Sequence, residues 1–228
     1  MGKKITSSSE AHKVYQEISA KILSGEFPSG HRLVESDLAA KFGVSRTPVR
    51  LAIERLVSEN LARHEVNRGA VVRQMTIQDI RNLFSIREVN EGLAARLASQ
   101  HVDSKDDERF FSVLKDMEEA LNRNDLHTYY DLSGAIHQIV RDMADNEFLN
   151  DFLDKIYVMT YRYHINIMLL PGRAAQSYRE HQAIVEAVLS QDGDRAEKAM
   201  IDHIKTISSF YNDDRNRVFF SFYDKSFW

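Results

Sequence analysis

The chain has no cysteine and little proline or glycine. Among its 228 residues there are 3 Pro and 9 Gly. The absence of cysteine excludes disulfide bonds, thiolate metal sites and cysteine nucleophiles. Because Pro and Gly are the residues that most often interrupt helices, their scarcity favours long helical segments. We therefore expect a mostly helical protein.

Long hydrophobic runs are also missing. No apolar stretch approaches the ~18 residues that a membrane-spanning helix needs. The first residues, MGKKITSSSEAHK, carry lysines but no apolar segment after them, so they do not form a secretory signal. A cytoplasmic protein without a membrane partner is the expectation.

Charge is distributed unevenly along the chain. Residues 1–75 contain 12 Lys and Arg against 8 Asp and Glu, a balance of +4, whereas residues 76–228 contain 18 against 26, a balance of −8. This asymmetry predicts an anion-binding module at the N-terminus, followed by a module that does not bind polyanions.

The pattern of residues 1–75 predicts a winged helix-turn-helix domain. An apolar stripe marks a first helix, and a second, short helix in HRLVESDLAAKFG ends at Gly43. Only the residues GVS separate it from a third helix, as in a helix-turn-helix. A hairpin signal around NRG then predicts a wing, with Arg68 and Gly69 at its tip.

The stretch FGVSRTPVR indicates that the third helix is a recognition helix. Ser45 is the predicted N-cap and Pro48 lies in the first turn. Arg46, Thr47 and Arg50 point away from the apolar face, where a recognition helix contacts the major groove. The alternative is a capped helix with solvated arginines, and the adjoining wing argues against it.

The segment RLVESDLAAKFGVSRTPVRLAIERLVSENLARHEVNRGAVV resembles the DNA-binding domain of the GntR superfamily of bacterial transcription regulators. The resemblance covers residues 10–73. It implies double-stranded DNA as a partner and a contact at position 36, where many relatives have arginine and this chain has Ser36. A two-fold homodimer would bind a short palindromic operator.

Residues 76–213 predict an antiparallel all-α bundle, because six helical patterns of about twenty residues follow one another with short polar turns. The order IREVNEGLAARLAS, IHQIV, NEFL, YREHQAIVEAV and GDRAEKAMIDHI resembles the FCD effector domain of the FadR-like branch. Six helices instead of seven suggest its VanR-type subgroup. The resemblance implies dimerisation and binding of a small-molecule effector by this domain.

Three histidines on three different predicted helices are candidate metal ligands: His137, His181 and His203. Each alone is more simply a core histidine, but together they could bind Zn²⁺ or Ni²⁺. The resemblance implies an Asp four residues before the first His, where this chain has Ser133. Three readings stay open: a site completed by water, one completed by a ligand carboxylate, and a metal-free anion pocket.

Four further residues are candidates for effector binding. Arg87 and Arg162 lie mid-helix among apolar neighbours, where they could hold a carboxylate-bearing effector, and Tyr129 and Tyr163 could line its cavity. The alternative for Arg87 is a structural ion pair with Glu91, one helical turn away.

The last segment, residues 214–228, contains six aromatic side chains and is expected to pack against the rest of the protein. The whole pattern predicts an effector-controlled DNA-binding regulator and not an enzyme. Two alternatives are a metal-dependent enzyme, for which no general base is marked, and a DNA-binding architectural protein whose bundle only dimerises.

Overall fold

The computed structural model describes residues 7–168 and 170–211, with the backbone alone for Ser7, Ser8 and residues 161–166. The predicted aromatic segment 214–228 lies outside the described residues. The described chain divides into two units between Thr76 and Ile77, and each unit has its own core.

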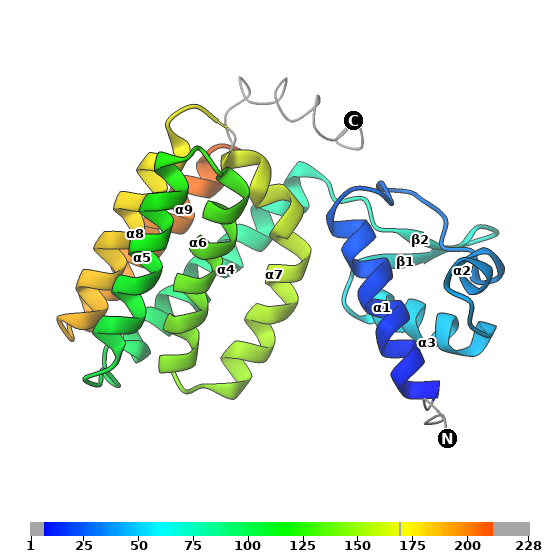
Figure 1. Ribbon diagram of the computed structural model, residues 1–228, viewed down its shortest axis with the longest axis horizontal. Coiled ribbons are helices and arrows are strands. Elements are labelled where there is room, and N and C mark those ends of the chain that lie inside the picture. The colour runs from blue at the N-terminus through cyan, green and yellow to red at the C-terminus, as the bar shows by residue number, and fades with distance from the viewer. Residues whose placement is uncertain (1–6, 169, 212–228) are drawn as a thin grey trace. The chain divides into compact units, whose positions relative to one another are not determined.

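The first unit contains three helices and one hairpin. They are α1 (Ser7–Leu23), α2 (Glu35–Phe42), α3 (Arg46–Ser58), β1 (Ala62–Glu65) and β2 (Gly69–Val72). α1 packs on α3, and their buried apolar residues include Val14, Ile18, Val49, Ile53 and Leu56. This is the predicted winged helix-turn-helix (Figure 1).

The turn between α2 and α3 follows the expected backbone chemistry. Gly43 caps α2 in the left-handed region, with φ 66°, and its N–H donates to the carbonyl of Ala39. Ser45 is the N-cap of α3, as predicted, with an extended backbone, but its side chain makes no capping hydrogen bond. The short turn therefore determines the residue at which α3 begins.

The wing is a two-stranded antiparallel hairpin in which Ala62 pairs with Val72 and Glu65 pairs with Gly69. Its turn needs two residues with positive φ, Asn67 at 62° and Gly69 at 73°. Arg32 forms an additional antiparallel bridge with Val71. The hairpin is therefore anchored to the segment that precedes α2.

The described part of the second unit contains six helices: α4 (Ile77–Ala98), α5 (Asp106–Asn122), α6 (Leu126–Met143), α7 (Glu147–Met168), α8 (Arg173–Leu189) and α9 (Gly193–Ser209). They pack side by side as a bundle (Figure 1), and short connections join them. The all-α prediction for this part of the chain is confirmed. Among the described residues, no helix is long and apolar enough to cross a membrane.

The interior of this bundle contains both apolar and polar side chains. Gly92 allows α9 to approach α4 closely, and apolar side chains such as Phe84, Phe110 and Ile204 are fully buried. Alongside them, charged and polar side chains from four helices are also buried, among them Arg87, Glu91, His137, Arg173, His181 and His203. Such groups require partners, because unpaired charge in a protein interior is strongly unfavourable.

Candidate functional site

The N-terminal turns of α3 expose three of the residues predicted to contact DNA. The side chains of Arg46, Thr47 and Arg50 face solvent. Arg46 and Arg50 have no ion pair with the described residues, whereas Arg55, further along the helix, pairs with Glu59 at 2.9 Å. Two guanidinium groups are thus available to phosphate or guanine.

The wing tip and the start of α2 carry the other predicted DNA contacts. Arg68 and Gly69 are exposed, and Nη1 of Arg68 lies 2.7 Å from Oε2 of Glu65. The Arg32 guanidinium donates through Nε to the carbonyl of Arg68, at 3.1 Å. Ser36 is also exposed, and its hydroxyl donates to Asp37 at 3.0 Å. Arg32 is therefore a further cation beside the wing that the sequence pattern did not mark.

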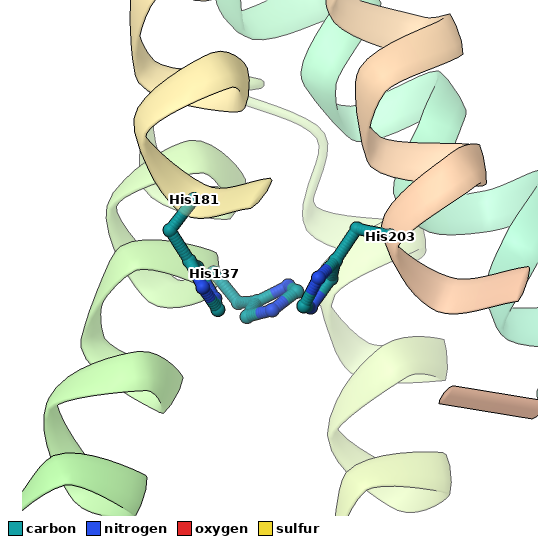
Figure 2. A group of neighbouring side chains, drawn as sticks. All are labelled: His137, His181 and His203. Carbon is teal, nitrogen blue, oxygen red and sulfur yellow. The ribbon is translucent and has the colours of Figure 1, made fainter. Parts of the chain in front are cut away.

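The bundle brings the three predicted histidines together. His137 on α6, His181 on α8 and His203 on α9 point toward one another (Figure 2), and one ring nitrogen of each lies within 4.8 Å of the others. All three side chains are buried. Two nitrogens bound to one Zn²⁺ lie at most about 4.2 Å apart, because Zn–N bonds are about 2.0–2.1 Å long, so one shared ion would draw the three rings slightly closer together.

The Nδ1 atom of each ring lies close to an oxygen atom outside the cluster. His181 contacts the carbonyl of Ser177 at 2.7 Å, and His203 contacts Oε2 of Glu180 at 2.7 Å. His137 lies 2.5 Å from Oε2 of Glu91, an ion-pair contact that does not meet hydrogen-bond geometry. Engagement of Nδ1 leaves Nε2 as the atom that each ring offers to a ligand, as is usual for metal-binding histidines.

Burial also sets the protonation of the central ring. Burial, with a smaller effect from His137, lowers the pKa of His181 to about 3. The imidazole is therefore neutral near pH 7, and the hydrogen bond from Nδ1 to Ser177 leaves a lone pair on Nε2. A neutral imidazole is the form that coordinates a metal.

Arg87 forms the predicted ion pair with Glu91, through Nε at 2.6 Å, and both side chains are almost fully buried. Tyr157 Oη donates to the other carboxylate oxygen at 2.5 Å. Burial alone would raise the pKa of the Glu91 carboxyl, but Arg87 and His137 outweigh it and hold that pKa well below its usual range. The carboxylate is therefore charged and connects Arg87 to His137.

The ion pair with Glu91 does not satisfy all the hydrogen-bond donors of the Arg87 guanidinium. Its Nη1 and Nη2 atoms are buried and have no hydrogen-bond partner among the described residues. The group lies 5.0 Å from the Phe84 ring centre and 4.6 Å from that of Tyr157. Two parallel N–H donors in an aromatic surrounding are suited to a carboxylate, which accepts both.

Ser133 lies at the edge of the histidine cluster, with Oγ 3.4 Å from Nε2 of His181. The carboxylate that the family resemblance implies would come from this position. Asp131 cannot replace it, because its side chain is half exposed and contacts His127 at 3.5 Å. The described residues therefore supply three imidazoles and a hydroxyl, which is a weak ligand.

The remaining residues of interest for effector binding include predicted ones and ones that the sequence pattern did not indicate. Tyr129 is fully buried on α6, whereas the side chains of Arg162 and Tyr163, on α7, lie outside the described part of the structure. The sequence pattern did not mark Tyr157, nor Arg173, which is 1% exposed. A signal for Arg173 existed, since a cation in the first turn of a helix opposes the helix dipole and needs another reason to be there.

The two units match known families. Residues 82–206 match the FCD domain, and residues 10–72 match the bacterial regulatory proteins of the gntR family. The chain belongs to the GntR family and carries an FCD domain. FCD domains in this family often bind a metal, and the three-histidine cluster lies within the matched residues.

Similar GntR proteins are transcription regulators. The chain is 26% identical to the HTH-type transcriptional repressor RspR of Escherichia coli K12, over 86% of both chains. It is 30% identical to a probable D-xylose utilization operon transcriptional repressor of Paenarthrobacter nicotinovorans, over 89% of this chain and 88% of the relative.

The solved structure of E. coli McbR/YncC has the same fold, with a TM-score of 0.76 at 18% identity, over 91% of this chain and 99% of that one. Together the GntR and FCD matches identify a DNA-binding transcription regulator with a C-terminal effector-binding domain. The alternative of a metal-dependent enzyme is not supported.

Proposed function

We propose that a carboxylate-bearing small molecule binds at the polar cluster of the FCD domain and controls the affinity of the winged helix for its operator. The observation that carries this proposal is Arg87, a buried guanidinium whose Nη1 and Nη2 atoms have no partner among the described residues. Its charge is paired with Glu91, but each buried N–H donor left without an acceptor costs about 1–3 kcal/mol, and an acceptor from outside the chain would remove that cost.

A metal ion would share this site. His137, His181 and His203 would hold Zn²⁺ or Ni²⁺ through Nε2, since their Nδ1 atoms are engaged elsewhere. The ion would supply a positive charge and an open coordination position. The weak donor at Ser133 leaves that position to an effector carboxylate, whose second contact is Arg87.

On the DNA side, Arg46, Thr47 and Arg50 would enter the major groove, while the wing residues Arg68 and Gly69 and the exposed Ser36 would contact the backbone or the minor groove. Two copies of the chain would form a homodimer, and its two equal recognition helices would require a palindromic operator. The family supports both assignments, because GntR regulators bind DNA and are typically dimers.

Coupling between the sites would be a shift of populations. An effector that binds one arrangement of the dimer more tightly than another changes the occupancy of both, and by linkage the operator changes effector affinity by the same factor. Arg87 lies on α4, which follows directly on the DNA-binding unit in the chain. An effector-induced movement of α4 would therefore occur in the helix that directly follows the DNA-binding unit in the chain.

A thermal-shift screen of small carboxylates and sugar acids, followed by operator titrations, tests the proposal. Carboxylates that raise the melting temperature of the wild type should not raise that of Arg87→Met, and should no longer change its operator affinity. Arg123→Met removes an exposed arginine from the same domain and should respond as the wild type. Equal responses of Arg87→Met and Arg123→Met would contradict the proposal.

The architectural alternative predicts a bundle whose interior is only apolar. The buried groups around Arg87, His137 and His181 count against it, because a bundle that served only to dimerise would gain more stability from apolar residues of similar size.

A further inference from the structure

A second pair of unsatisfied donors lies in the bundle, apart from Arg87. Arg173 is 1% exposed, and its Nε and Nη1 atoms have no partner among the described residues. The hydroxyl of Tyr129, which is fully buried, also has no hydrogen-bond partner of good geometry among the described side chains. Burial raises the pKa of Tyr129 to about 12, although the neighbouring Ser177 side chain and the Arg173 guanidinium act to lower it.

Helical spacing places these groups on the faces that carry the histidines. On α6, Tyr129 precedes His137 by eight residues, and on α8, Arg173 precedes His181 by eight, with Ser133 and Ser177 halfway. Residues four apart share one face of a helix and are about 6 Å apart along its axis. A buried polar column therefore extends from the histidines to Tyr129 and Arg173.

Arg173, like Arg87, contacts a glutamate that in turn contacts one of the three histidines. Its Nη2 donates to Oε2 of Glu180 at 2.8 Å, and the same oxygen lies 2.7 Å from Nδ1 of His203. Arg87 reaches His137 through Glu91 in the same way. The cluster thus has one arginine–glutamate–histidine chain on each of two sides.

Charge balance indicates the kind of ligand that both chains accept. Each arginine is already neutralised by one glutamate, so the two chains have no net charge. A divalent ion at the histidines would add two positive charges, which a ligand with two carboxylates would balance. The Arg87 end offers a fork of two N–H donors, and the other end offers Nε and Nη1 of Arg173 and the hydroxyl of Tyr129.

We propose that Arg173 and Tyr129 form a second subsite of the effector site, which binds a second carboxylate, so that the effector is a small dicarboxylate. This inference rests on the proposed carboxylate effector and adds to it the ligand class and two recognition residues.

The test compares diacids with monoacids of equal chain length on the full, Zn²⁺-loaded protein. Succinate, glutarate and adipate are titrated by calorimetry against butyrate, pentanoate and hexanoate. The best diacid should bind about tenfold or more tightly than its monoacid, as expected for added hydrogen bonds to a charged group. Tyr129→Phe, which removes only a hydroxyl, and Arg173→Met should both reduce that ratio toward one.

Two results would overturn the second subsite: diacids no tighter than their monoacids, or a diacid advantage that survives in both variants. Binding of monoacids alone would leave the proposed function standing. Conversely, if Arg87→Met binds monoacids as well as the wild type while Tyr129→Phe removes the diacid advantage, the role given to Arg87 fails and the second subsite stands.

Discussion

A Cβ atom on Gly92 of α4 would lie 2.7 Å from Cγ1 of Ile201 on α9. Gly92→Ala should therefore destabilise the protein, because overpacking of about 1–3 kcal/mol outweighs the ~1 kcal/mol by which alanine favours a helix. Gly134→Ala, in α6, is the matched control, since an added Cβ there has no neighbour within 4 Å. Urea denaturation should show a loss of stability for the first variant and a gain of about 0.5–1 kcal/mol for the second.

Arg46→Ala and Arg50→Ala should each weaken operator binding by about 1–3 kcal/mol, because each removes an exposed guanidinium of α3 that forms no ion pair with the described residues. Arg123→Ala makes the same change of charge in the FCD domain and serves as the control. Mobility-shift titrations measure the three affinities. If both α3 variants bind as tightly as the control, α3 is not the recognition helix.

Glu65 competes with DNA for the wing arginine. Arg63, with help from Arg68, holds the pKa of the Glu65 carboxyl below its usual range, so the carboxylate is charged at neutral pH. Glu65→Gln should release Arg68 and raise DNA affinity several-fold at low salt. Arg68→Ala should lower affinity for all sequences alike and reduce the salt slope by about one. A Glu65→Gln protein that binds more weakly than the wild type would place Arg68 away from phosphate.

Ser133→Asp should raise affinity for Zn²⁺, because a carboxylate one helical turn before His137 adds a fourth protein ligand. An increase of roughly tenfold to a hundredfold is expected, the scale on which even the outer partners of a metal act. Ser133→Asn is the control, since it has nearly the same shape and no charge. Competition with a chelator, on protein without a His-tag, measures both. Equal affinities in the two variants would argue against coordination from this position.

The helix-turn-helix was predictable because its signals are local. Gly43, Ser45 and Pro48 occur within six residues, and each specifies a backbone conformation that the structure contains. The side-chain contacts could not be predicted from the sequence in the same way. Ser45 makes no capping bond, and Arg68 pairs with Glu65, a contact that depends on the fold of the hairpin.

The effector site was predictable only in part, because its geometry comes from packing. Sequence spacing indicates that His137, His181 and His203 each lie beside an apolar stripe, but only the bundle fixes their separation. The position of Arg173 in the first turn of α8 is a sequence signal, but its connection to His203 through Glu180 depends on how α8 and α9 pack.

The buried polar column also bears on how much of the regulator a cell contains. Donors without acceptors among the described residues, such as those of Arg87 and Arg173, lower the stability of the ligand-free chain. A ligand at 100 times its Kd would add about 2.7 kcal/mol to the free energy of unfolding. Because proteases degrade chains largely in proportion to the population that opens, the same molecule that sets operator affinity would slow the turnover of the protein that senses it.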